Sequence, residues 1–447
     1  MELEELKKII QECGVVGAGG AGFPTYAKFD KKADTILLNV AECELLLSLH
    51  RELMERHADQ IMEAFHLVAE TVGAEHAIIG IKGSYDEAVE AIRANLDKYP
   101  EMDVHLLPDV YPMGDEVVLT YECTGRVIEP GGLPIQKGVI VFNVETMYNV
   151  YHAIWDHRPV ADKLVSVVGE VRNPMSIRAR LGMTLKDLVR EVGGETIEDP
   201  VYVVGGAMMG VIKPPTTPVT KTTNAVLVLP KDHPVVVKKQ RNASIDLKRA
   251  ASICCQCQTC TDLCPRHNLG HPIDPARFMR SASNADFQDM KPFLDTFFCC
   301  SCGVCELYAC PQDLAPRTLI GIYKGGLRKN GVRAPKVEAV PVRETRELRK
   351  VPEARLMTRM GLAKYDVPSP KADYDAGLAD NVKILMSQHI GAPAVPIVKV
   401  GQKVKFRDTI AKPGNGLSVA IAASIDGTVT EVTDTYVCIT ADKEGKV

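Results

Sequence analysis

The chain has 447 residues and a formal net charge of −4, from 53 Lys and Arg against 57 Asp and Glu. An apolar fraction of 46% with 25% charged residues excludes a disordered or collagen-like chain. The near-neutral charge disfavours nucleic acid as the main partner, and the length suggests about three domains. Cysteine is the unevenly distributed residue, because ten of the 14 lie between Cys254 and Cys310.

The sequence carries no signal for membrane insertion or secretion. Membrane-spanning helices need about 20 consecutive apolar residues, a length that no stretch here reaches. The acidic N-terminal segment lacks the apolar core of a secretory signal. We therefore expect a soluble, intracellular protein, in which closely spaced cysteines bind metal or carry redox chemistry rather than form disulfides.

The first 160 residues alternate β-rich runs with helical patterns, which predicts an α/β domain around a parallel sheet. The expected strands are 35–40, 76–81, 104–108 and 138–143, and the expected helices are 51–72, 85–99 and 145–156.

A glycine-rich loop lies near the start of this domain. Residues Gly17–Gly22 satisfy G-x-G-x-x-G, but a dinucleotide-binding Rossmann site requires a strand before the loop and a helix after it. Here a helical apolar pattern precedes the loop, and Phe23-Pro24 follows it. We therefore expect a loop whose backbone approaches a phosphate or a flat ring, with Lys28 supplying charge.

Residues 161–240 predict a small α+β unit, with strands at 164–169, 201–204 and 225–229 and a helix at 185–192. Residues 241–325 are cysteine-rich and predict short helices.

Two cysteine motifs dominate this third region. The first is C-x2-C-x2-C-x3-C followed by Pro265, and the second is C-x2-C-x2-C-x4-C followed by Pro311. In two-cluster ferredoxins the fourth cysteine of each motif binds the other cluster. We therefore assign two [4Fe–4S] clusters to two ligand sets, Cys254, Cys257, Cys260 and Cys310 for one, and Cys299, Cys302, Cys305 and Cys264 for the other.

Two alternatives accompany this assignment. Zinc ribbons separate two C-x2-C pairs by about 12–20 residues, whereas each set of four is compact here, which favours iron–sulfur. Cys255 and Cys300 each follow a first ligand, so each is either a spare thiol beside its cluster or the sign of a register shifted by one. Spacing and proline position favour the register given above.

A basic segment follows the cysteine motifs. Residues 324–364 hold 12 Lys and Arg but only four Glu, interrupted by Pro335, Pro341 and Pro352. The pattern is typical of an extended arm. It is either a solvated linker or a docking strip for an acidic electron-transfer partner. The tail from 381 predicts a compact all-β module.

Four motifs in the first domain occur in a defined order. They are Gly17–Thr25 (GAGGAGFPT) with Lys28, Asn39–Glu44 (NVAECE), Tyr111–Glu116 (YPMGDE) and Asn143–Thr146 (NVET). This series resembles the flavin-binding subunit of NADH:quinone oxidoreductase (complex I) and the Rnf-C protein of the Rnf complex. The resemblance continues through a β-grasp module of the SLBB type and into the paired cysteine motifs. Because the complex I protein carries one cluster, the two motifs favour the Rnf branch.

The resemblance implies a multidomain α/β protein of five parts. These are a Rossmann-like FMN and NADH domain (1–160), an SLBB β-grasp module (161–240), a helical ferredoxin-like domain with two [4Fe–4S] clusters (241–325), a basic linker arm (326–380) and a C-terminal barrel-sandwich hybrid (381–447).

Residue by residue, the resemblance implies contacts to two cofactors. FMN contacts fall on Gly17, Gly19, Gly20, Lys28, Asn39, Glu42, Gly114, Asp115, Asn143 and Thr146. NADH contacts fall on Phe23, Glu44 and Glu116. Catalysis is expected to run through the cofactors, without a catalytic side chain.

The tail narrows the branch. Three segments resemble a lipoyl-like barrel-sandwich hybrid, and they are His389–Pro393, Val400–Val404 and Ile425–Val429. Rnf-C proteins carry this module at the front of the chain. No lysine lies between Lys412 and Lys443, so the hairpin has no acceptor for a prosthetic group, and the module is expected to dock or cover.

The rear placement resembles the cobalamin reductases of propanediol-utilisation microcompartments. That resemblance implies an NADH-dependent reductase that is cytoplasmic, inside or attached to a microcompartment, and that passes electrons to cobalamin or to a cobalamin-handling enzyme. No Asp-x-His-x-x-Gly corrin motif occurs, so cobalamin is implied by resemblance alone. The alternatives are an Rnf-C-like protein that delivers electrons to ferredoxin, another iron–sulfur protein, or a membrane or shell partner, and a shell-associated electron conduit.

Overall fold

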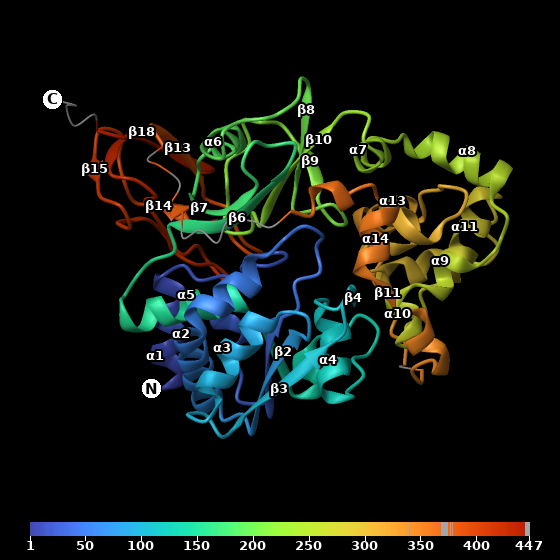
Figure 1. Cartoon of the computed structure of the whole chain (residues 1–447), viewed down its shortest axis with the longest axis horizontal. Coiled ribbons are helices and arrows are strands. Elements are labelled where there is room, and N and C mark those ends of the chain that lie inside the picture. The colour runs from blue at the N-terminus through green and yellow to red at the C-terminus, as the bar shows by residue number, and fades with distance from the viewer. Residues whose placement is uncertain (339, 368–373, 376, 378, 443–447) are drawn as a thin grey trace.

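The computed structural model describes residues 1–338, 340–367, 374–375, 377 and 379–442. Parts of the expected basic arm (326–380) and of the expected tail module (381–447) therefore lie outside the described residues. Figure 1 shows an α/β domain in blue and cyan, a mixed sheet in green, a helical region in yellow and a β module in red. The expected fold class is confirmed.

The first domain is built on a parallel sheet with the order β3-β2-β1-β5. The strands are β1 (Thr35–Val40), β2 (His76–Lys82), β3 (Met102–Leu107) and β5 (Val139–Asn143). The helices are α1 (Leu3–Glu12), α2 (Leu49–Val72), α3 (Asp86–Leu96), α4 (Glu116–Thr124) and α5 (Val144–Trp155). The central strand β1 is a nearly continuous apolar run, as expected for a strand covered on both faces.

Strand order creates a switch point beside β1. The chain runs from β1 outward to β2 and β3, and then returns to the other side of β1 as β5. Ligands of open parallel sheets bind at the carboxyl ends of the strands next to such a reversal. Here that position lies above β1 and β5.

The second domain is a mixed sheet with the order β12-β7-β6-β10-β8-β9. Its elements are β6 (Asp162–Gly169), β7 (Met175–Arg180), α6 (Leu185–Glu191), β8 (Pro200–Val204), β9 (Val211–Lys213) and β10 (Ala225–Pro230). The edge strand β12 (Tyr374–Asp375) comes from the segment before the tail.

The third region consists of short helices, many of which begin with proline. They are α7 (Pro234–Lys239), α8 (Ala243–Ile253), α9 (Thr259–Asp262), α10 (Pro265–Asn268), α11 (Pro275–Ser283), α12 (Lys291–Leu294) and α13 (Pro316–Lys329). Proline suits a first helical position, where its missing N–H has no partner to lose. Phe278, Phe293 and Ile320 form the small core.

The basic segment is more ordered than an extended arm. It contains β11 (Val351–Pro352), which pairs with β4 (Val110–Tyr111), followed by α14 (Glu353–Arg359). Buried apolar side chains such as Leu356 anchor it. Its cations meet acids of the first domain, since both Arg346 and Lys350 pair with Glu122. Charge that the sequence displays as an unbalanced run is therefore partly neutralised by distant carboxylates.

The tail forms two small sheets, with the orders β13-β19-β18-β15 and β14-β16-β17. The strands are β13 (Asn381–Leu385), β14 (Val395–Pro396), β15 (Lys403–Val404), β16 (Thr409–Lys412), β17 (Ile421–Ala422), β18 (Gly427–Val432) and β19 (Tyr436–Thr440). The all-β expectation is confirmed. The tail shares one apolar core with the second domain. None of the helices in the described part of the chain has the length and apolarity needed to cross a membrane.

A buried ion pair joins the first two domains, and we predict a large effect of breaking it. Lys163 of β6 pairs with Glu145 of α5, and their side chains are 2% and 5% exposed. The substitution Lys163→Met leaves a buried, unpaired carboxylate, which costs about 3–5 kcal/mol. Urea denaturation followed by circular dichroism measures this loss. Lys231→Met, at an ion pair with 72% and 78% exposed partners, is the control and should change stability by less than about 1 kcal/mol.

Candidate functional site

The switch point brings two predicted FMN-contact residues into register. Asn39 of β1 is the direct strand partner of Asn143 of β5. Each asparagine shapes the loop after its own strand, because Asn39 Oδ1 accepts from the Ala41 backbone N–H at 3.0 Å and Asn143 Oδ1 accepts from Glu145 N–H at 2.9 Å. Segments 104 residues apart in sequence thus form adjacent walls at the carboxyl edge of the sheet.

The glycine-rich loop lies against these walls. The Ala18 N–H donates to Thr146 Oγ1 at 3.0 Å, and a Cβ atom on Gly19 would lie 3.1 Å from Asn143 Nδ2. The Gly17 N–H donates to the Phe23 carbonyl at 2.9 Å and closes the loop. Gly20, at the exposed tip, has nothing within 4 Å of a Cβ position. The loop therefore offers open backbone close to both asparagines.

Gly114 is required by close packing at the same edge. A Cβ atom at this position would lie 2.2 Å from the Ala41 carbonyl oxygen, a distance that no side chain can adopt. Asn39 Nδ2 donates to the Gly114 carbonyl at 2.9 Å and holds the approach. The next residue, Asp115, caps α4 by accepting from the N–H groups of Val117 and Val118. The YPMGDE motif is thereby fixed onto the NVAECE motif.

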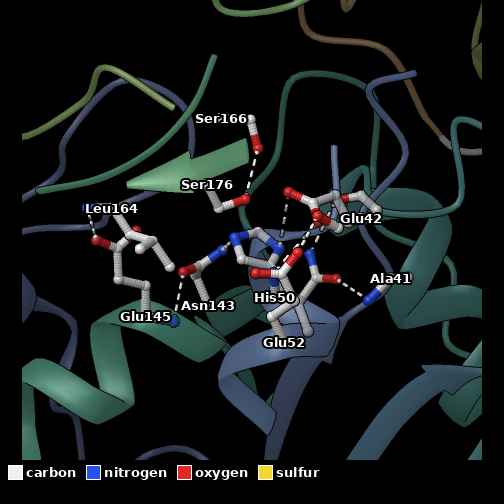
Figure 2. A network of polar contacts seen from close by, with 12 residues as sticks. Ala41, Glu42, His50, Glu52, Asn143, Glu145, Leu164, Ser166 and Ser176 are labelled. Atoms are coloured by element: carbon white, nitrogen blue, oxygen red, sulfur yellow. Dashed lines mark hydrogen bonds and ion pairs between the residues drawn. The ribbon is translucent and has the colours of Figure 1, made fainter. Parts of the chain in front are cut away.

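A buried histidine, not predicted from the sequence, connects these motifs. Figure 2 shows His50 between Asn143 and Glu42. Because Asn143 Oδ1 already accepts, its Nδ2 donates to His50 Nε2 at 3.0 Å. The His50 backbone N–H in turn donates to Glu42 Oε2 at 3.2 Å. Accepting at Nε2 requires a neutral ring, and burial lowers the pKa of His50 to about 4.

Glu42 is a buried acid with few direct donors to its carboxylate. Burial raises the pKa of Glu42 to about 7, against the lowering effects of the His50 N–H and of Lys82. Lys82 donates to the Glu42 carbonyl oxygen and also pairs with Glu353 of the basic segment at 2.6 Å. An acid with a pKa near neutrality beside the predicted flavin contacts can exchange a proton at working pH.

Lys28 faces the same region from the other side of the loop. Its Nζ donates to the Val141 carbonyl at 3.0 Å. Burial lowers the pKa of Lys28, and the nearby Glu116 carboxylate partly opposes that effect. Lys28 and Glu116 are therefore close enough to interact, although their motifs are far apart in the sequence.

The three residues predicted for NADH are not gathered in one place. Phe23 is half-buried and bonded to the loop through its backbone, and Glu116 is exposed in the first turn of α4. The Glu44 carboxylate instead accepts from the Met208 and Met209 N–H groups of the second domain, at 2.9 and 2.6 Å. Burial raises the pKa of Glu44 to about 7. Glu44 thus joins two domains, and the NADH contacts remain predictions.

One predicted cysteine set lies directly against the flavin domain. The Tyr111 hydroxyl donates to the Cys302 carbonyl at 2.7 Å, and Arg266, next to the Cys264-Pro265 step, pairs with Asp115 at 2.7 Å. Cys302 and Cys305 are only 8% and 7% exposed. We call Cys264, Cys299, Cys302 and Cys305 the inner set.

The other set faces outward. Cys254, Cys257, Cys260 and Cys310 line a hollow of about 470 Å³, together with Arg280 and other side chains. Cys257 and its neighbour Cys255 are exposed. Burial and the neighbouring thiols, Cys310 first among them, raise the pKa of Cys260 to about 12. We call these four cysteines the outer set; the structure groups Cys310 with them as the motif spacing predicts.

The longer gap in the second motif has a structural cause. Residues Cys305–Ala309 form a π-helical turn, which accommodates one residue more than an α-helical path. Glu306 within it is buried and accepts from the backbone and hydroxyl of Thr318 at 2.8 and 3.0 Å. The extra residue therefore widens the turn while Cys310 still reaches the outer set.

Comparison with known families agrees with this division. The FMN-binding domain of Nuo51 matches residues 10–152, an SLBB domain 164–212, a 4Fe–4S dicluster domain 253–315 and the RnfC barrel sandwich hybrid domain 372–445. The cobalamin reductase PduS of Citrobacter freundii is 36% identical over 98% of this chain and 97% of its own. The chain belongs to the PduS family.

Two more distant likenesses cover less of the chain. The RnfC-type component of the Na⁺-translocating ferredoxin:NAD⁺ oxidoreductase complex of Acetobacterium woodii is 32% identical over 60% of this chain and 59% of its own. The crystal structure of an NAD⁺-reducing [NiFe]-hydrogenase in the H2-reduced state superposes with a TM-score of 0.50 at 19% identity, over 75% of this chain and 68% of that chain. The second likeness concerns the fold alone.

The residues fit the cofactors of these families. Two compact groups of four thiols suit two [4Fe–4S] clusters. Among the described residues no three metal-ligating side chains gather around a single point, as one zinc ion would require. The bare loop Gly17–Gly22 beside Asn143 suits the flat, phosphate-bearing FMN. FMN and two [4Fe–4S] clusters are therefore the cofactors of this member of the PduS family.

We predict that His50 orders the flavin site through Asn143. His50→Leu removes the acceptor for Asn143 Nδ2, so FMN affinity should fall about tenfold, the effect of one lost buried hydrogen bond. Titration of the flavin by its fluorescence measures the dissociation constant. His76→Leu, at an exposed position near the opposite end of the sheet, should leave the constant unchanged. An unchanged constant in His50→Leu would contradict the role given to His50.

Proposed function

We propose that the protein is an NADH-dependent cobalamin reductase that passes electrons from NADH through FMN and two [4Fe–4S] clusters to cobalamin. The observation that carries the proposal is similarity to a cobalamin reductase along 98% of the chain, tail module included. The Rnf-type relative matches only 60%. An Rnf-C-like role, with ferredoxin or a membrane or shell partner as acceptor, is therefore the second candidate.

The site residues suit such chemistry in distinct ways. A flavin accepts a hydride as two electrons and releases them singly, which iron–sulfur clusters and cobalt require. We assign the open backbone of Gly17–Gly22, with Lys28, Asn39 and Asn143, to flavin binding. Glu42 lies at the same edge with its pKa raised to about 7 by burial, and we assign it the exchange of the proton that accompanies hydride transfer. Phe23 and Glu116 are proposed to contact NADH.

The proposal extends to cellular context. The motif resemblance to the reductases of propanediol-utilisation microcompartments supports work in the cytoplasm, inside or attached to such a microcompartment. Cobalamin is then the substrate, delivered free or on a cobalamin-handling enzyme.

The first test is direct reduction of the corrin. Protein purified anaerobically and reconstituted should hold about eight Fe and one FMN per chain. With NADH it should convert cob(III)alamin to cob(II)alamin, followed by the corrin absorbance, and omission of FMN should abolish the reaction. Reduction of artificial dyes alone would exclude cobalamin reductase activity, and faster reduction of added ferredoxin would favour the second candidate.

The two cysteine sets differ in their position relative to the flavin domain. The inner set is tied to it through Tyr111 and Arg266, whereas the outer set opens into an exposed hollow. Electron transfer weakens steeply with distance, so we propose that the inner set is on the flavin side and the outer set on the acceptor side. The chain order of the two motifs is thus the reverse of the proposed order of electron flow at their first ligands.

Single-cluster variants test this order. In Cys257→Ala, NADH should still produce the electron paramagnetic resonance signal of a reduced inner cluster, while cobalamin reduction is lost. In Cys302→Ala, dithionite but not NADH should reduce the outer cluster. Iron content verifies that each variant keeps one cluster. NADH reduction of the outer cluster in Cys302→Ala would show that the order is wrong.

A further inference from the structure

The tail module touches the glycine-rich loop, although the two are separated by more than 360 residues. The Ile390 N–H donates to the Gly22 carbonyl at 3.3 Å. Just before the loop, Gln11 Nε2 donates to the Ser418 carbonyl at 3.0 Å, and the Ala420 N–H donates to the Gln11 carbonyl at 3.1 Å. Figure 1 shows the red tail placed between the green sheet and the blue N-terminal segments.

A buried lysine of the second domain holds this junction together. Lys221 Nζ donates to the Gly14 carbonyl at 2.6 Å and to the Ala420 carbonyl at 3.1 Å. Its own backbone N–H donates to Gln388 Oε1 of the tail at 3.0 Å. The residue is 2% exposed, and burial lowers the pKa of Lys221 to about 7. One residue therefore bonds both the segment leading into the flavin loop and the tail.

Packing at the junction leaves no space for adjustment. A Cβ atom on Gly14 would lie 2.4 Å from the Ala420 carbonyl oxygen. A Cβ atom on Gly22 would lie 2.7 Å from Thr222 Cγ2 and 3.3 Å from His389 Cα. Both ends of the loop are thus enclosed by the tail and by the turn around Lys221, whereas the tip at Gly20 stays open.

We propose that the tail module and the turn Thr220–Asn224 form a clamp that fixes the flavin loop in its binding conformation. The tail is then a stationary part of the flavin site, rather than a swinging arm or a surface for an external partner. This inference rests on the FMN-binding part of the proposed function and does not depend on the final electron acceptor.

The physical basis is preorganisation. A loop rich in glycine loses much backbone entropy when it is ordered. If clamp contacts order it in advance, the flavin no longer has to, and affinity rises. Coupling between two sites is reciprocal, so bound FMN must also stabilise the clamp contacts in the tail.

Substitutions in the clamp test the inference in the full-length, cluster-loaded protein. Lys221→Met removes both bonds from Nζ but keeps an apolar stem, and Gln388→Leu removes only the acceptor in the tail. Each should raise the FMN dissociation constant about tenfold, within the range of typical coupling, with iron content unchanged. The control is Lys403→Met, also in the tail but 79% exposed, which should not alter FMN binding. Unchanged FMN affinity in Gln388→Leu and in any folded Lys221→Met would overturn the clamp.

Hydrogen exchange of the unmodified protein provides a second readout that needs no variant. Adding FMN should slow amide exchange in tail segments 386–392 and 417–421, which touch the loop or its base, but not in 427–440. Equal exchange with and without FMN in the first two segments would contradict the inference. Because both measurements report FMN binding alone, a protein that fails to reduce cobalamin could still pass them, and an active reductase could fail them.

Discussion

The parallel pairing of β1 with β5 is the constraint on which the rest of the site depends. It places Asn39 beside Asn143, and every other predicted flavin contact is located by reference to this pair. Asn39 holds Gly114, Asn143 lies against Gly19, and His50 bonds Asn143. Since parallel strands end at one edge, four motifs spread over the first domain become a single surface. A shift of one residue in this register would turn both asparagines away.

Buried or half-buried polar contacts then fix the other domains to this surface. Lys163 pairs with Glu145, Arg266 with Asp115, and Lys82 with Glu353. Each bridge has one partner on or next to a motif of the flavin domain. Charges buried in this way are costly to separate, so the module arrangement is specified at the site itself. Distances between cofactor positions, on which electron transfer depends, are held by the same contacts.

The extent of successful prediction followed the range of the interactions. Cysteine spacing predicted two four-thiol sets, because ligands of one cluster come mainly from a short segment. Alternating runs predicted the strands of the first domain, such as Thr35–Val40, for the same local reason. The basic segment was predicted as an extended arm, yet Val351 pairs with Tyr111 and Arg346 with Glu122. Its partners lie more than 200 residues away, beyond the reach of composition.

The sequence by itself determined the modules, their order, the cluster ligands and the flavin motifs, because each is encoded in a short run of residues. Only the tertiary structure decided which cysteine set meets the flavin domain, that Glu44 bonds Met208, and that His50 supports Asn143. It also decided that the tail encloses the loop at the front of the chain, through contacts such as Lys221 to Ala420. Such contacts arise where separately folded units pack together, and their residues carry no local pattern that announces a partner.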